Sequence, residues 1–319
     1  MSNEKTTCIS TRDKVEYFER LIKKNRKDDF FIFDYLNGSG NELSTKFWSK
    51  RSSSRLAFDL YSWIVENKNV KDFSFEYMLP GVLTSKSGPS GVPNMDVYIE
   101  IDNNIVFIEN KYTEKSDFRY MDLDRLQSNG EKAKAKLSQA YYQNGTYGRS
   151  GLSLTDRFYG KKEIGEAFSN FCLEINDEII KLQVSDIKEC AWFDAKQDTC
   201  HLFGIIFYLL GTKIDHLNKR REELHNKKIS LCHIFWKMNK DNESAQFPIF
   251  FKQKAERLIN EILEGYGFNC KFDFRILTAQ SLFEQNIDFY GLNFMDALAY
   301  GTNKPLRVQM EQYIKTTQR

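Results

Sequence analysis

Two acidic residues and a lysine lie at the ends of one short segment of the chain, from Met95 to Lys111. Asp96 stands near its start, and Glu109 and Lys111 stand at its end with one residue between them. Carboxylates on adjacent strands are oxygen ligands of the kind that Mg²⁺ prefers, and a bound Mg²⁺ keeps several waters and grips a phosphate oxygen. A neighbouring lysine can orient or deprotonate the attacking water and neutralise developing charge. The spacing therefore indicates metal-dependent hydrolysis of a phosphodiester.

These side chains meet only if the segment folds as a β-hairpin. Its first half alternates, with Val97, Ile99 and Ile101 facing one way and Asp96, Tyr98 and Glu100 facing the other. Asp102-Asn103-Asn104 supplies the turn, because Asn and Asp tolerate the positive φ of tight hairpins. With a two-residue loop, Asp96 lies across from Glu109 or Lys111, and we expect all three on one face, with Asn110 on the other. The alternative is an edge hairpin whose charged residues are merely solvated.

The acidic and basic residues of this segment also resemble a known family. Pro93-Asn94-Met95-Asp96, followed after residues 97 to 108 by Glu109-Asn110-Lys111, resembles the PD-(D/E)XK restriction-endonuclease-like superfamily, although the proline stands three positions before Asp96. Other segments resemble, in the same order, a bacterial branch of restriction-endonuclease-like proteins. They are Ser53–Tyr61, Phe75–Tyr77, Met95–Val97, Ile108–Glu114, Trp192–Gln197 with His201–Leu202, and Ile276–Leu282.

The resemblance implies an α/β fold, with a mixed central sheet flanked by helices, and Mg²⁺-dependent cutting of DNA, with Mn²⁺ as a substitute ion. It implies catalytic roles for Asp96, Glu109 and Lys111, the two acids being the metal ligands. It also implies a supporting acid at Glu76 on the preceding strand and a polar residue at Gln197 on a following helix.

Two assignments on that helix stay open at this stage. Gln139 is a rival for the position of Gln197. His201 follows Gln197 by one helical turn and could share its face. The alternatives for His201 are a helix face in solvent and a core histidine with satisfied hydrogen bonds.

A basic segment between residues 45 and 55 is the best candidate for DNA contact. Its cations are Lys46, Lys50, Arg51 and Arg55, interspersed with hydroxyl and aromatic side chains and with no acid. Such residues grip phosphates, and Trp48 could stack on an unpaired base. The alternative is a solvated loop that leads into a helix, with Ser54 as the N-cap and Trp48 in the core. A second cluster, from Lys213 to Lys228, is diluted by acids and is better explained as a solvated helical face.

The rest of the chain predicts one α/β domain over residues 1–319. We expect an N-terminal helical extension over 1–50 and an insertion of short helices and loops over 112–190. Between these parts, periodicity and turn residues predict helices at 56–65, 196–210 and 250–263, strands at 73–77, 229–236 and 272–277, and a long loop at 80–93.

Composition fits a cytoplasmic globular enzyme. No segment has the pattern of a signal peptide or the length of a membrane span. The six cysteines never form Cys-x-x-Cys and fit reduced thiols. Cys200-His201 and Cys232-His233 are a poor zinc set, because neighbours on a strand face opposite sides. The net charge of +2 restricts any DNA contact to local clusters.

Three classes of function remain. The first is a DNA endonuclease of restriction or defence, for which double-strand cutting suggests a homodimer and host protection suggests a partner methyltransferase. The second is a nuclease of the same fold that acts in repair or on RNA. The third is a non-catalytic nucleic-acid-binding scaffold. A Glu109 buried in an ion pair with Lys111 and far from Asp96 would favour the third.

Overall fold

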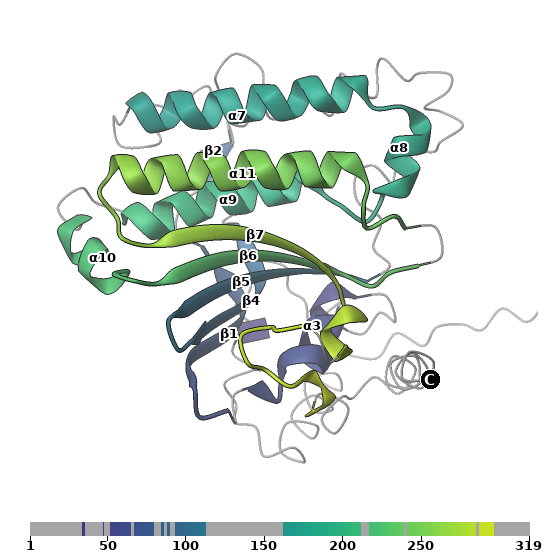
Figure 1. Cartoon of the computed structure of the whole chain (residues 1–319), viewed down its shortest axis with the longest axis vertical. Coiled ribbons are helices and arrows are strands. Elements are labelled where there is room, and N and C mark those ends of the chain that lie inside the picture. Colours follow the sequence, from purple (N-terminus) through teal and green to yellow (C-terminus); the bar gives the residue numbers. More distant parts are fainter. Residues whose placement is uncertain are drawn as a thin grey trace, which may run out of the picture.

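The protein is an α/β structure built on one five-stranded mixed sheet, as its computed structural model shows (Figure 1). The structure describes residues 34–35, 47, 52–64, 67–79, 84–85, 88–89, 93–112, 162–211, 217–238, 241–284 and 287–296. The sheet order is β1-β4-β5-β6-β7, and the strands are β1 (Val70–Met78), β4 (Asn94–Ile101), β5 (Asn104–Lys111), β6 (Lys228–Phe235) and β7 (Lys271–Thr278). The strands predicted from alternation are confirmed.

The predicted hairpin is formed by β4 and β5. Ile101 pairs with Asn104, so the loop has two residues, and Asp102 takes a positive φ of 51° as expected of a turn aspartate. β1 joins β4 in the antiparallel half of the sheet, whereas β5, β6 and β7 are parallel to one another. The parallel half requires crossover connections, and helices supply them.

Two helices lie against one face of the sheet with a third packed on their outer side, and a shorter set covers the other face (Figure 1). The first face carries α9 (Ala195–Leu210) and α11 (Gln246–Gly265), and α7 (Lys162–Lys181) packs on these two helices. The apolar residues of all three form one core with Tyr98, Phe107 and Leu231 of the strands. The opposite face carries α3 (Ser53–Tyr61), η6 (Ser281–Phe283) and η7 (Phe294–Asp296), packed on Val97, Ile99 and Ile108. The predicted alternation of β4 is thus confirmed over Val97 to Ile101.

Some elements differ from the predictions. The stretch 112–190 was expected to hold only short helices, yet α7 has 20 residues and contributes Phe168 and Ile175 to the core. A short helix, α8 (Val184–Glu189), follows it. The predicted loop 80–93 contains a small hairpin of β2 (Thr84–Ser85) and β3 (Gly88–Pro89). Residues 113–161, and all of 1–50 except 34, 35 and 47, lie outside the described residues.

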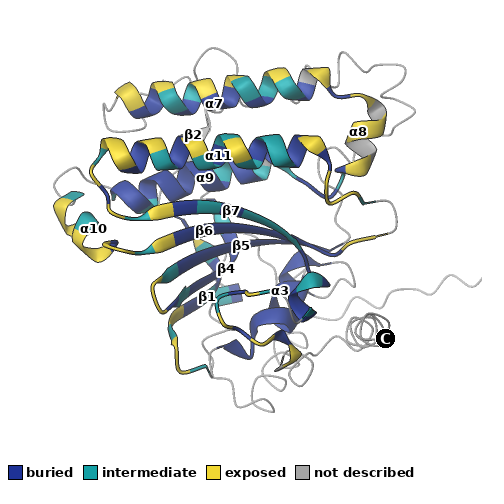
Figure 2. Ribbon diagram, in the orientation of Figure 1, coloured by how far each residue is buried: buried dark blue, intermediate teal, exposed yellow. Residues whose placement is uncertain are grey.

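The middle strands are buried along most of their length, whereas α10 (Leu217–Glu223) is largely exposed (Figure 2). Arg220 and Arg221 of α10 donate to backbone carbonyls of Tyr208 and Tyr266, at 2.7 and 2.6 Å. These contacts fit a structural role for the second basic cluster. No helix in the described ranges has the length and apolar character to cross a membrane.

Candidate active site

Lys111 is the last residue of β5, and its ammonium lies between two acceptors. Its Nζ is 2.7 Å from Oε1 of Glu109 and 2.5 Å from Oε1 of Gln197. Glu109 and Lys111 are two positions apart on one strand, so their side chains lie on the same face. Both are buried. The pairing therefore fixes a positive charge at the carboxyl end of β5.

Gln197 reaches Lys111 because α9 begins just before it. The side chain of Asp194 caps the helix by accepting from the backbone N–H of Gln197 at 3.0 Å. This places Gln197 in the first turn, directly over the end of β5. The structure thus brings Gln197 to the predicted site, while its rival Gln139 lies outside the described residues.

Asp96 lies where the pairing of β4 and β5 ends. The last paired residues are Val97 and Ile108, and the same register continued by one places Asp96 opposite Glu109. Oδ2 of Asp96 accepts from the backbone N–H of Asn110 at 2.7 Å, in the place of a ladder hydrogen bond. The carboxylate is thus in the gap between the strands, beside Glu109.

Asp96 is surrounded by negative charge. Burial raises its pKa well above the ordinary value, and the nearby carboxylates of Glu109 and Glu76 raise it further. The charge of Lys111 and the N–H of Asn110 lower the pKa but do not outweigh these effects. A cluster of carboxylates that resists ionisation is a place where a cation would be stabilised.

Glu76 comes from β1, in register with Asp96. The pairs on either side are Phe75 with Val97 and Tyr77 with Met95. The backbone of Glu76 has a φ of 48°, in the left-handed region that is uncommon outside glycine, asparagine and aspartate. Ser54 on α3 donates to Oε1 of Glu76 at 3.2 Å. Predicted as a supporting acid, Glu76 lies close enough to Asp96 to raise its pKa.

His201 is a buried histidine and does not face solvent. Its Nε2 donates to the backbone carbonyl of Asn94 at 3.0 Å and lies 3.6 Å from Oε2 of Glu109, and its Nδ1 lies 3.5 Å from Oδ1 of Asp198. Burial lowers the pKa of His201, but the negative charges of Glu109 and Asp198 outweigh this effect and raise it. His201 is thus a core histidine, as the second alternative expected, but its hydrogen bonds are only half satisfied, because Nδ1 has no hydrogen-bond partner in the described part of the chain.

Asp198 is a site neighbour that the sequence analysis missed. His233 on β6 places Nδ1 2.8 Å from Oδ2 of Asp198, so the carboxylate stands between two histidines. Burial would raise the pKa of Asp198, but the charges and hydrogen bonds of His233 and His201 lower it. The signal that could have found it is an acid three positions before His201 in a helix that is otherwise largely apolar.

The opposite face of the strand holds Asn110, as predicted. The hydroxyl of Tyr61, on α3, donates to Oδ1 of Asn110 at 3.4 Å. Nδ2 of Asn110 is buried without a hydrogen-bond partner. The residue between Glu109 and Lys111 therefore packs toward α3, and its neighbours face α9.

The predicted DNA-binding segment is described only in part. Lys46, Lys50 and Arg51 lie outside the described residues. Arg55 is buried, with Nε 3.4 Å from Oδ2 of Asp59 and its guanidinium 5.1 Å from the ring centre of Phe47. This environment is that of a packing residue on α3, so Arg55 differs from the exposed phosphate contact we expected.

The cap of α3 also differs from the alternative proposed for this segment. The Ser52 side chain accepts from the N–H of Arg55 at 3.2 Å and caps the helix, whereas Ser54 was expected to do so. Trp48 lies outside the described residues.

The two Cys-His pairs do not assemble a zinc site. Both histidines contact Asp198, whereas Sγ of Cys232 lies 3.6 Å from the hydroxyl of Tyr290 on the other face.

Within the described ranges, no group of three or more His, Cys, Asp or Glu side chains is arranged to hold a metal. Mg²⁺ is often bound through only one or two carboxylates, because it keeps its waters and takes ligands from the substrate. Asp96 and Glu109 fit that smaller requirement.

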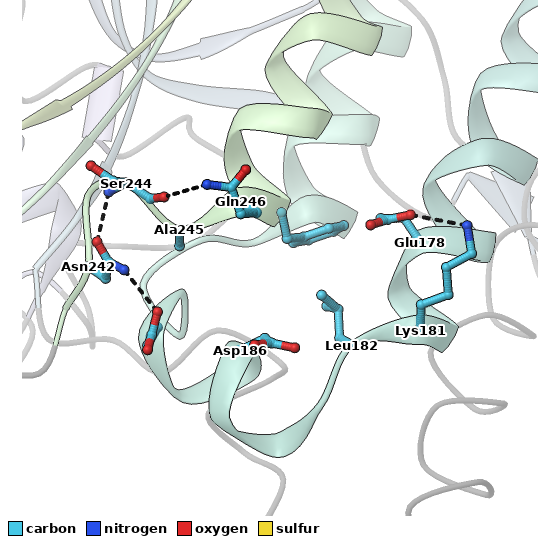
Figure 3. Close-up of a pocket in the computed structure, with 10 residues that line it drawn as sticks. Glu178, Lys181, Leu182, Asp186, Asn242, Ser244, Ala245 and Gln246 are labelled. Carbon is cyan, nitrogen blue, oxygen red and sulfur yellow. Dashed lines mark hydrogen bonds and ion pairs between the residues drawn. The ribbon is translucent and has the colours of Figure 1, made fainter.

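A separate hollow of about 330 Å³ lies between α7, α8 and the start of α11 (Figure 3). Its polar groups are paired among themselves. Lys181 contacts Glu178 at 3.3 Å, and Asn242 donates to Glu189 at 2.8 Å. None of the acids around Lys111 lines it. We therefore assign the candidate site to the end of β5.

No protein-family model, curated protein or solved structure matches the chain. The chemistry of the candidate site therefore rests on the contacts of Asp96, Glu109 and Lys111 themselves.

Proposed function

We propose that the protein is a Mg²⁺-dependent DNA endonuclease with a restriction-endonuclease-like fold. The observation that supports this most directly is the ammonium of Lys111, held between Glu109 and Gln197 beside the carboxylate of Asp96. A lysine alone neutralises part of this negative charge. The raised pKa of Asp96 indicates that the cluster has room for a further positive charge.

In this proposal Asp96 and Glu109 hold the ion, and Lys111 acts next to it. A bound Mg²⁺ would supply a polarised phosphate oxygen and a more acidic water. Lys111, kept in place by its two acceptors, orients the attacking water and offsets the charge that develops on the phosphate. Gln197 fixes the lysine, and Glu76 adds to the negative potential that attracts the ion.

The biological setting is a further part of the proposal. Restriction or another defence against foreign DNA is the setting that the resemblance implies. Cutting both strands with one site per chain suggests a homodimer, and protection of host DNA suggests a partner methyltransferase. Repair substrates and RNA are alternatives for the same site, because its residues act on a phosphodiester in each.

One observation favours a non-catalytic nucleic-acid-binding scaffold as the second candidate. Glu109 is buried in an ion pair with Lys111, which is half of the arrangement expected of that class. The other half is a Glu109 far from Asp96. Because the register of β4 and β5, continued by one residue, places Asp96 opposite Glu109, the two residues are neighbours across the strands, and this favours the nuclease.

The decisive test is cleavage of unmodified plasmid and phage DNA by the purified protein, with Mg²⁺, with Mn²⁺ and with EDTA. Asp96→Asn and Glu109→Ala are compared with Asp177→Asn, an exposed aspartate on α7. We expect cutting that needs the ion, is lost in the two site variants and persists in the control. Discrete fragments indicate sequence recognition, and a smear indicates its absence. If neither DNA, branched DNA nor RNA is cut, the nuclease proposal is wrong and the scaffold is favoured.

A further inference from the structure

Four ionisable side chains form a continuous buried row beside the proposed site. They run from Glu109 on β5 through His201 and Asp198 on α9 to His233 on β6, and each is at most 2% exposed. Successive contacts are 3.6, 3.5 and 2.8 Å. The row ends at the backbone carbonyl of Trp192, 3.4 Å from Nε2 of His233.

Burying such a row of ionisable groups in a core is unfavourable in free energy. Buried charges lose hydration, and well-packed apolar side chains of similar volume stabilise a fold as well or better. The surroundings of α9 are apolar, with Leu202, Phe203 and Ile206 close by in sequence and buried. Packing alone therefore does not explain why His201 and Asp198 are polar, whereas their contacts with Glu109 and His233 do.

His201 connects the two strands that carry the proposed metal ligands. One nitrogen, Nε2, faces both the carbonyl of Asn94, two residues before Asp96, and Oε2 of Glu109. The other nitrogen faces Asp198, which His233 holds from the neighbouring strand. The imidazole is thus held by one hydrogen bond, to the carbonyl of Asn94, and lies between the charges of Glu109 and Asp198, although its Nδ1 has no hydrogen-bond partner among the described residues. Oε2 of Glu109 faces this ring, and Oε1 of the same carboxylate contacts Lys111.

We propose that His201 and Asp198 are positioning residues that hold the Glu109 carboxylate, and with it the end of β4, in place for the divalent ion of the proposed function. The inference rests on that function and adds residues to it. Polar groups that orient metal ligands change metal affinity or activity by about 10- to 100-fold when they are removed.

The test is Mn²⁺ binding to the metal-free full-length protein without DNA, followed by electron paramagnetic resonance and calorimetry. We expect His201→Leu to weaken Mn²⁺ binding by about 10- to 100-fold and His201→Gln, which restores a donor, to recover part of the loss. If His201 serves packing alone, His201→Leu should bind Mn²⁺ more tightly than His201→Gln, because leucine suits an apolar core better than glutamine. His225→Leu, at an exposed histidine, should bind as the wild type does.

Asp198→Asn serves as the second variant if His201→Leu does not fold, and it should weaken binding in the same direction. A wild type that binds Mn²⁺ together with His201 and Asp198 variants that bind it equally well would overturn the positioning role alone. A wild type that binds no Mn²⁺ and cuts no nucleic acid would overturn the proposed function, and the positioning role with it. Melting temperatures of all variants show that the compared proteins are folded.

Discussion

Nζ of Lys111 and Oε1 of Glu109 are 2.7 Å apart, and both side chains are buried. Each charge therefore depends on the other for its stability. Removing one partner of such a pair leaves the other charge desolvated, which costs far more than the loss of an exposed pair. Loss of Glu109 is therefore expected to affect folding as well as the candidate site.

Glu109→Ala should therefore abolish cutting and also lower the free energy of unfolding by about 3–5 kcal/mol, because Lys111 stays buried with the amide of Gln197 in place of a carboxylate. Urea unfolding followed by circular dichroism measures the second effect. Glu178→Ala removes the half-buried partner of the exposed Lys181 and should cost less than about 1 kcal/mol. Equal stability of Glu109→Ala and the wild type would contradict the ion pair.

Asp96→Asn should stabilise the protein, whereas Glu109→Ala destabilises it, and the size of this gain should depend on pH. The pKa of Asp96 is raised in the folded protein above its ordinary value of 3.8, so the folded state binds the proton more tightly than the unfolded chain. The contribution of Asp96 to the free energy of unfolding is fully present below pH 3.8 and is lost as pH rises through the folded pKa. Asparagine does not titrate, and it keeps an acceptor for the N–H of Asn110.

Without metal, Asp96→Asn should therefore match the wild type near pH 4 and become the more stable protein as pH rises. The difference grows by at most about 1.4 kcal/mol per pH unit and then levels off above the folded pKa. Urea unfolding in EDTA at a series of pH values measures it. Asp177→Asn should show no such trend, and a flat difference for Asp96→Asn would refute the raised pKa.

The regular elements near the site were predictable because their hydrophobic periods are strong. Val97, Ile99 and Ile101 alternate cleanly, and a two-residue turn restricts the register, so the approach of Asp96 to Glu109 or Lys111 followed from local pattern. The observed register selects Glu109. The helix of Gln197 was likewise visible as an apolar run after Asp194. These features are therefore determined by the local sequence.

Other features depend on tertiary contacts that no local pattern encodes. Asp198 is an acid in an apolar helix, and its role appears only when His233, from a strand 35 positions later, meets it. Arg55 was expected to contact DNA as part of a basic segment, but Asp59 and Phe47 accommodate it in the interior. The cap of α3 was ambiguous because Ser52 and Ser54 are equally suitable by residue type.

Gln197→Ala should slow cutting while the protein remains folded. It removes an acceptor 2.5 Å from Nζ of Lys111, and a lost hydrogen bond to a charged group costs about 1.5–3 kcal/mol of stability. Because the lysine is then less well oriented, we expect a loss of about 10- to 100-fold in the single-turnover rate. Gln246→Ala, at an exposed glutamine of α11, should leave both quantities unchanged. An unaltered rate in Gln197→Ala would remove this residue from the site.

Glu76 combines an unusual backbone with a place beside Asp96, and the two properties can be measured separately. At its φ of 48°, a side chain with a Cβ is disfavoured by about 1–2 kcal/mol. Glu76→Gly should therefore be more stable than Glu76→Ala by about 1 kcal/mol, although both lose the carboxylate. At Ser74, two residues earlier on β1 and outside the set of positive-φ residues, alanine should be the more stable of the same two replacements. Thermal and urea unfolding of the four variants test this. If alanine is also preferred at position 76, the backbone there is not left-handed, and the approach of Glu76 to Asp96 must be achieved in another way.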